Sequence, residues 1–255
     1  MPADGLAVGP RKRDFRQRAH ANPLADQSFD VPARPSAVGW EGKFTPEAWR
    51  AGGGRIAFAD VGCGFGGLLM ALSAKFPDKL CVGMELRDKV SAYVQERIAG
   101  HREESGGQRA GNACCMRVNA MKALPNYFER GTLEKLFFLY PDPHFKRTNH
   151  RRRIVSTQLL AEYAYCLGVG ALVYTVTDVE ELHLWMAEHL EAHALFERVS
   201  EEELAADPVA PLLKTSSEEG QKVARNSGSH FIAVFRRIED PRLNREGAPA
   251  KRQRA

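Results

Sequence analysis

The most distinctive chemical feature of the sequence is an aspartate held between two prolines at the end of an apolar run. Residues 137–143 read FFLYPDP, and residues 144–153 then carry five lysines or arginines and no acidic residue. Each proline restricts its own φ and drives the preceding residue toward extended backbone, so Asp142 has few conformations. A structural Asp-Pro turn would explain the prolines alone. The adjacent charge favours a rigid carboxylate that meets an anionic substrate in one pose.

The basic block after Asp142 predicts a phosphate-binding surface. Its candidate contacts, flanked by Arg152 and Arg153, are Lys146, Arg147, His150 and Arg151. If an α-helix begins near Thr148, residues 147 and 151 share one face, as do 149 and 153. Such a face can bind the backbone of a nucleic acid beside the carboxylate. Phe145 and Tyr140 could stack on bases, although core packing is the ordinary use of such rings.

A second feature is a glycine loop followed by an acidic strand end. In DVGCGFGGLL, Gly62, Gly64 and Gly67 fit G-x-G-x-x-G between a strand and a helix, and Glu85 ends the next strand. Glycines let the backbone approach a ligand at the positive end of a helix, and the carboxylate can hold two ribose hydroxyls. A tight structural turn would also fit the glycines alone. With strand, helix and acid in register, the pattern predicts an adenosine-containing cofactor.

These residues leave the choice between NAD and S-adenosylmethionine open, because both place an adenosine ribose at such a carboxylate. Asp60 could serve the methionine end of S-adenosylmethionine or hydrogen-bond to the loop. Asn119, at the end of a third strand, could read the adenine edge or form a turn.

A carboxylate at position 142 suits guanine as the reacting base. Guanine offers N1–H and N2–H₂ donors on one edge, whereas its N7 is a free lone pair on the opposite side. Because N7 bears no proton, its methylation needs no general base. The enzyme has only to align that lone pair with a methyl sulfonium.

The elements that position these residues alternate along the chain. Apolar runs predict strands at 55–62, 80–86, 113–120, 133–142, 171–178 and 229–239. Helical spacing predicts helices at 66–76, 88–98, 153–170 and 177–193. Asp88 is the expected N-cap of the second helix, a glycine ends the third, and Thr177 with Glu180 forms a capping box for the fourth. Alternating strands and helices predict an α/β domain with a doubly wound, mostly parallel sheet.

Composition sets the boundaries of this domain. Residues 1–53 are rich in Pro, Gly and charge and predict an extended, partly disordered arm, residues 54–240 form the domain, and residues 241–255 form a basic tail. The net charge is +4, but the basic residues are clustered, which suggests a polyanionic partner. The five cysteines form no CxxC pair and indicate reduced thiols. No apolar run predicts a membrane span or a signal peptide.

Several motifs in one order resemble the tRNA (guanine-N7)-methyltransferases, in particular their eukaryotic catalytic subunit. The resemblance covers roughly residues 11–241 and is carried by FRQRAHANPLAD, DVGCGFGGLL, GMELR, NAM, FLYPDPHFKRTNHRRRI, LLAEYAYCLGVGALVYTVTDV and TSSEEGQKVARN. It implies a Rossmann-like class I methyltransferase fold, S-adenosylmethionine as donor, no metal, and transfer to the variable-loop guanosine of tRNA.

The resemblance also implies roles for individual residues. Asp142 would be the catalytic residue, and Lys146, Arg147 and the basic segment after them would meet tRNA. The TSSEEG segment would close over the cofactor, with Ser217 standing where the family usually has threonine. The implied cofactor contacts, with Asp60 as the methionine-end candidate, are Gly62, Gly64, Glu85, Arg87, Asn119, Ala120, Leu139, Ser217 and Glu219. A WD-repeat subunit that does no chemistry is the implied partner, and the nucleus is the expected location.

Two other functions fit part of the pattern. An NAD-dependent oxidoreductase would use the same glycine loop but leaves the PDP turn and the basic block unexplained. A non-catalytic RNA-binding subunit would be expected to have a degenerate cofactor site, which intact Gly62, Glu85 and Asp142 argue against. His189 and His193 have a metal-compatible spacing without an evident third ligand, so an exposed helix face is the favoured interpretation.

Overall fold

The computed structural model describes residues 9–15, 17, 21–26, 29–225 and 228–242. Within these residues lies one seven-stranded sheet in the order β3-β2-β1-β4-β5-β7-β6. The strands are β1 Ile56–Val61, β2 Leu80–Glu85, β3 Ala113–Arg117, β4 Leu133–Leu139, β5 Leu167–Thr177, β6 Phe196–Arg198 and β7 Phe231–Arg237. Strands β1 to β5 are parallel to one another, and β7 pairs antiparallel with β5 and β6. The predicted doubly wound, mostly parallel sheet is confirmed.

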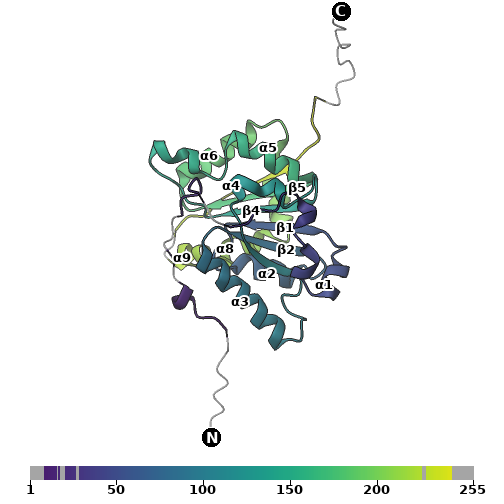
Figure 1. Ribbon diagram of the computed structural model, residues 1–255. Coiled ribbons are helices and arrows are strands. Elements are labelled where there is room, and N and C mark those ends of the chain that lie inside the picture. Colours follow the sequence, from purple (N-terminus) through teal and green to yellow (C-terminus); the bar gives the residue numbers. More distant parts are fainter. Residues whose placement is uncertain (1–8, 16, 18–20, 27–28, 226–227, 243–255) are drawn as a thin grey trace, which may run out of the picture.

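Helices cover both faces of the sheet (Figure 1). One face packs against α2 Gly67–Lys75, α3 Asp88–Glu104 and α8 Ala210–Thr215. The other packs against α1 Pro46–Ala51, α4 Ala120–Ala123, α5 Thr157–Cys166 and α6 Glu180–Glu191. The remaining α-helices are α7 Glu201–Ala206 and α9 Glu218–Arg225. Because both faces are covered, β1 and β2 are buried along their whole length, which is why they read as continuous apolar runs.

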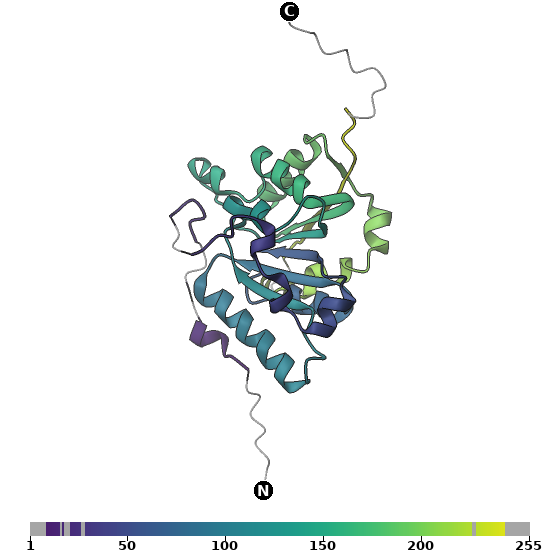
Figure 2. The same ribbon diagram turned by 45° about the vertical axis from the view of Figure 1, so that its right-hand side comes forward.

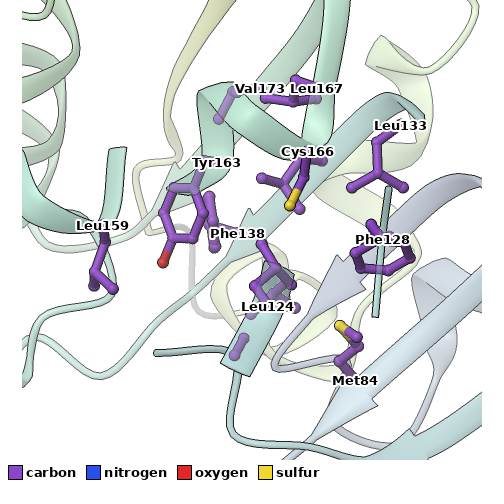
Figure 3. Packing of buried hydrophobic residues seen from close by; sticks show 14 of the residues in the cluster. Met84, Leu124, Phe128, Leu133, Phe138, Leu159, Tyr163, Cys166, Leu167 and Val173 are labelled. Carbon is purple, nitrogen blue, oxygen red and sulfur yellow. The ribbon is translucent and has the colours of Figure 1, made fainter. Parts of the chain in front are cut away.

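The core lies between the sheet and these helices. On the α5 face, Phe138 of β4 meets Tyr163 of α5 with ring centroids 5.0 Å apart, and Leu124 and Leu159 pack around them (Figure 3). Neighbouring Cys114 and Cys115 of β3 enter opposite cores, as strand alternation requires. All five cysteines are free and buried, which agrees with the predicted reduced thiols.

Three local predictions are wrong at helix ends. Arg87, not Asp88, is the N-cap residue of α3, and it makes no side-chain cap bond. The helix predicted at 153–170 begins after the Ser156 cap and ends at Cys166, so its glycines belong to β5 instead. Thr177 does not cap α6, because its Oγ1 accepts from the backbone N of Val179 at 3.1 Å and Val179 is the N-cap residue.

The basic block adopts a 3₁₀-helix, Arg147–Arg152, rather than the predicted α-helix. Its backbone bonds run from residue 149 to 146 and from 153 to 150. Side chains three apart therefore align, instead of those four apart. The expected pairing of 147 with 151 on one face does not form.

The predicted extended arm, residues 1–53, folds at its end. Within it lie 3₁₀ turns at Lys12–Phe15, Pro35–Ala37 and Trp40–Lys43, followed by α1. Phe44 joins the core at 6% exposure. The purple N-terminal segment lies beside α3 and α9 in Figures 1 and 2. Residues 1–8 of the arm and 243–255 of the predicted basic tail lie outside the described residues.

None of the helices in the described part of the chain is long and apolar enough to cross a membrane.

Candidate active site

The carboxyl ends of β1, β2, β3 and β4 meet at one edge of the sheet, where open α/β sheets bind ligands. A cavity of about 200 Å³ lies there. The predicted site residues in its wall are Gly62, Glu85, Arg87, Asn119, Ala120, Leu139 and Asp142. Sequence reasoning missed Ala21, Pro23, Met84 and His144 in the same wall, and it named Tyr140 only for base stacking and Arg152 only as part of the basic block. The strand topology thus joins the predicted cofactor loop to the PDP turn.

The glycine loop has the conformation that its sequence predicts. Gly62 and Gly64 have φ of 74° and 54°, a region that residues with a Cβ rarely adopt. The backbone N of Gly64 donates to Oε2 of Glu85 at 3.1 Å, so the acid holds the loop. A Cβ on Gly67 would lie 2.0 Å from the carbonyl oxygen of Ser216. The third glycine therefore permits close packing of the segment before α9 against the start of α2.

Glu85 already has a full set of donors. Its Oε1 accepts from the backbone N of Arg87 at 2.9 Å and from Arg87 Nε at 3.1 Å. Its Oε2 accepts from Arg87 Nη2 at 2.9 Å as well as from Gly64. Because a carboxylate offers about four lone-pair sites, ribose hydroxyls at Glu85 compete with the Arg87 side chain. Arg87 lies in the cavity wall with its side chain 19% exposed, so it can turn outward without unfolding anything.

Asp60 lies beneath this loop at the end of β1 and is 3% exposed. Burial, and then the negative charges of Glu85 and Glu218, raise the pKa of Asp60 to about 7. Three carboxylates around one point create an electronegative site. That site favours a ligand cation, such as an α-ammonium group, over an anion.

Asn119 does what the turn interpretation predicted. Its Oδ1 accepts from the backbone N of Met121 at 3.2 Å and caps α4. Its Nδ2 donates to the carbonyl oxygen of Pro23 at 2.7 Å, in a buried bond across 96 residues of sequence. The amide thus holds the N-terminal arm, and contact with adenine stays a prediction.

The arm forms part of the cavity wall through Ala21 and Pro23. It is tied down on both sides of that point. Lys122 Nζ donates to the carbonyl oxygen of Ala25 at 2.9 Å, and Lys12 Nζ lies 2.6 Å from Oε1 of Glu218 on α9. The arm therefore links the cavity to the TSSEEG segment. In the sequence, the only signal for it was the family resemblance of FRQRAHANPLAD.

The PDP turn is held in a strained conformation. Tyr140 and His144, on either side of it, have φ of 49° and 46°. The backbone N of His144 donates to Oδ1 of Asp142 at 3.4 Å, and His144 Nδ1 lies 3.8 Å from Oδ2. The Tyr140 hydroxyl bonds His230 Nδ1 at 2.6 Å, and burial, then Asp178 and Glu219, raises the pKa of Tyr140 to about 12. Asp142, with its side chain 28% exposed, lies in the cavity wall.

The basic block divides into three groups. Lys146, Arg147 and Arg151 are exposed, as a phosphate-binding surface requires, and Phe145 beside them is 66% exposed. The predicted contact His150 instead packs edge-on against Trp185, with ring centroids 5.2 Å apart. Arg152 lies in the cavity wall, and Arg153 is buried. Sequence reasoning treated all of these cations as equivalent.

Ser217 and Glu219 lie outside the cavity wall in the described structure. Ser217 caps α9, because its Oγ accepts from the backbone N of Gly220 at 3.0 Å. Glu219 is exposed and lies 3.3 Å from Lys222 Nζ. A cofactor contact from either residue stays a prediction. The segment itself does border the site, since Ser216 packs on Gly67 and Glu218 acts on Asp60.

Comparison with known proteins decides the family. A family model described as "Putative methyltransferase" matches residues 54–233. The chain is 56% identical over 238 residues to the tRNA (guanine-N(7)-)-methyltransferase of Drosophila simulans, over 93% of this chain and 92% of that protein. It is 55% identical over 240 residues to that of Drosophila virilis, over 93% and 96%. The chain belongs to the tRNA (guanine-N7)-methyltransferase family.

Within this family the chain is an S-adenosylmethionine-dependent enzyme with a Rossmann-like class I fold. Among solved structures, the aminoglycoside resistance methyltransferase NpmB1 is similar over 82% of this chain and 99% of that chain, with 13% identity and a TM-score of 0.48. Because the matching family model and the Drosophila relatives are methyltransferases, the NAD-dependent alternative is wrong.

The donor set at the cavity fits S-adenosylmethionine. Glu85, in the cavity wall, is a carboxylate suited to ribose hydroxyls. Asp60, buried two residues before Gly62 and outside that wall, is a carboxylate suited to an ammonium group. Among the described residues, no group of three or more His, Cys, Asp or Glu could hold a metal ion. His189, one of the two histidines with metal-compatible spacing, instead stacks on Trp185 with ring centroids 4.2 Å apart.

Proposed function

We propose that this methyltransferase transfers a methyl group to N7 of a guanosine in the variable loop of tRNA, with Asp142 as its catalytic residue. The observation that carries the proposal is the shared cavity wall. Asp142 lies three residues beyond the end of β4, Glu85 ends β2, and the glycine loop follows β1, which lies between β2 and β4 in the sheet. A base held at Asp142 is therefore presented to a cofactor held at Glu85.

The chemistry assigned to Asp142 is orientation. Its carboxylate accepts hydrogen bonds from N1–H and N2–H₂ of guanine, which turns N7 toward the interior of the cavity. S-adenosylmethionine supplies an electrophilic methyl group on its sulfonium. N7 carries no proton, so the residues have only to align the reactants and exclude water. The strained turn supports this role, because it restricts the carboxylate to one direction.

The cofactor is held by residues of the first two strand ends. Glu85 binds the ribose hydroxyls, and these bonds replace its hydrogen bonds to the Arg87 side chain. Asp60, in its ionised form, takes the ammonium group of the methionine end. Gly62 and Gly64 bring the backbone close to the ligand.

The tRNA phosphates contact Lys146, Arg147 and Arg151, which are exposed and lie within nine residues of Asp142 in the sequence. Phe145 is the exposed ring nearest Asp142 in sequence and is available to stack on a base. His150 takes no direct part in this surface because it packs on α6.

A WD-repeat subunit completes the enzyme, and the complex works in the nucleus. The resemblance of the sequence motifs to the eukaryotic catalytic subunit supports both the partner and the location. Co-expression with a WD-repeat candidate, followed by size-exclusion chromatography and activity assays with and without it, tests the partner. Imaging of a tagged chain, with and without residues 243–255, tests the location.

The reaction is tested with unmodified tRNA and methyl-labelled S-adenosylmethionine. Product nucleosides are identified by mass spectrometry, and the position by borohydride–aniline cleavage, which is specific for N7-methylguanosine. Label at a variable-loop guanine supports the proposal, and label at another position refutes it. Full cofactor binding without any methyl transfer, with or without the partner, would favour the non-catalytic RNA-binding alternative.

A further inference from the structure

Arg153 is the last cation of the basic block, yet its side chain is only 1% exposed. Its Nε donates to the carbonyl oxygen of Pro143 at 2.9 Å. Its Nη2 donates to Oε1 of Glu181 at 2.6 Å, and the guanidinium lies over the ring of Trp185, 4.7 Å from the centroid. A buried cation is tolerated when it is paired and hydrogen-bonded. Arg153 is therefore committed to these partners and is not available to a phosphate.

Arg153 turns inward directly after the 3₁₀-helix. It is the C-cap residue, with φ of −64° and ψ of 134°, and its backbone N donates to the carbonyl oxygen of His150 at 2.9 Å. Both reach α6, since His150 Nε2 lies 3.7 Å from Oε1 of Glu181 and packs on Trp185. Arg151, two residues before Arg153, remains exposed. Neighbouring cations in one block thus have different roles.

The partners of Arg153 are themselves fixed. Glu181 and Trp185 lie one turn apart on α6, so they present one surface. The indole Nε1 of Trp185 donates to the carbonyl oxygen of Val155 at 2.8 Å. Its ring stacks on His189. Arg153 is thereby anchored to a helix that packs on the sheet.

The PDP turn, which Arg153 contacts through Pro143, requires contacts that hold its strained backbone. Tyr140 and His144 each adopt a left-handed backbone conformation, which is strained for residues other than glycine and persists only where surrounding contacts hold it. Pro143 lies between Asp142 and His144 and has no N–H of its own to donate. Its carbonyl is the group through which Arg153 ties the turn to α6.

We infer that Arg153 is a positioning residue, which sets the direction of the Asp142 carboxylate by holding the Pro143 carbonyl against α6. The inference rests on the proposed catalytic role of Asp142. Arginine is required because its Nε and Nη2 lie in one rigid plane and reach two acceptors at once. Lysine keeps the charge but offers one compact donor group.

The test compares Arg153→Lys with Arg237→Lys as a matched control. Arg237 is partly exposed, whereas Arg153 is buried, and the Nε of Arg237 donates to the carbonyl oxygen of Ala164 at 3.2 Å, away from the PDP turn. We expect Arg153→Lys to lower the single-turnover methylation rate between about tenfold and 100-fold. Affinity for S-adenosylhomocysteine and the salt dependence of tRNA binding should stay within about twofold. Arg237→Lys should leave the rate unchanged.

A double variant shows whether Arg153 acts through Asp142. Residues that act as a unit have non-additive effects. In an Asp142→Asn background, adding Arg153→Lys should lower the residual rate by less than about twofold. A further tenfold loss would overturn the inference. A normal rate in Arg153→Lys, with an impaired rate in Asp142→Asn, would also overturn the inference. A normal rate in Asp142→Asn would instead refute the proposed catalytic role of Asp142.

Glu181→Gln provides a second route if Arg153→Lys does not fold. Glutamine keeps an oxygen acceptor for Nη2 but removes the ion pair, and position 181 is 57% exposed. The single-turnover rate should fall at least about threefold, with cofactor and tRNA affinities unchanged. An unchanged rate would overturn the inference, as would an equal loss in tRNA affinity, which would place Arg153 in RNA binding.

Discussion

Asp60→Asn should stabilise the protein above neutral pH while weakening cofactor binding. The carboxyl group is fully buried, and its pKa rises from 3.8 to about 7 in the folded chain. The folded state therefore binds this proton more tightly than the unfolded state does. Consequently the wild-type free energy of unfolding falls as pH rises from about 4 to about 7. Asparagine carries no titrating group, so this loss is absent in the variant.

The magnitude follows from the shift. At 1.36 kcal/mol per pKa unit, the raised pKa of Asp60 corresponds to about 4 kcal/mol at pH 8. Part of this loss is already present at pH 5. Between pH 5 and pH 8, the stability advantage of Asp60→Asn over wild type should grow by about 3 kcal/mol, or roughly 6 to 12 °C in Tm for a domain of this size.

Chemical denaturation at several pH values measures this difference, with Asp78→Asn as the control because Asp78 is exposed. Calorimetric titration with S-adenosylhomocysteine then measures the functional loss. Losing one charge-assisted bond to an ammonium group is worth about 1.5 to 3 kcal/mol, which is roughly tenfold to 100-fold in affinity. A pH-independent stability difference would refute the argument from burial. Unchanged affinity would refute the assignment of Asp60 to the methionine end.

Gly67→Ala places a Cβ 2.0 Å from the carbonyl oxygen of Ser216 and should destabilise the fold by about 1 to 3 kcal/mol. The control Gly42→Ala, with open space around the new Cβ, should leave stability unchanged. Equal melting temperatures of the two variants would contradict the packing argument. Arg151→Glu should weaken tRNA binding more at low salt than at high salt, and a salt-independent effect in filter binding would exclude a phosphate contact. Arg55→Glu, at the opposite edge of the sheet, is its control. Removal of residues 1–26 takes Ala21 and Pro23 from the cavity wall and should speed S-adenosylhomocysteine dissociation in stopped-flow measurements; an unchanged rate would show that the arm does not cover the ligand.

Local pattern was sufficient for the parts of the fold that depend on neighbouring residues. The parallel strands were predictable because burial on both faces makes β1 and β2 continuously apolar. The glycine loop was predictable because only glycine combines positive φ with close backbone contact. These constraints lie within a few residues of chain. The backbone of the PDP turn was not predictable, because Tyr140, which precedes Pro141, has a φ of 49° instead of the extended value that a following proline favours.

The tertiary structure decided the roles of polar residues that have several possible partners. Thr177 is buried at the end of β5 and bonds two residues onward, so its hydroxyl is not available to cap α6 one turn later. Asn119 bonds Pro23 across 96 residues, and no local pattern reports a contact of that separation. The same holds for Lys12 and Glu218, which join the arm to α9.

Arg151 and Arg153 show most clearly the difference between what the sequence predicts and what the tertiary structure decides. In the sequence both are basic residues in one run, and charge alone predicted one role for both. The run winds as a 3₁₀-helix packed against α6, so one side chain is directed to solvent and the other to Glu181, Trp185 and the carbonyl of Pro143. Residue type determined that a cation would stand at each position. Which cation is exposed and which bonds the carbonyl of Pro143 was decided by the surface that this segment packs against, because direction is a property of the packed chain.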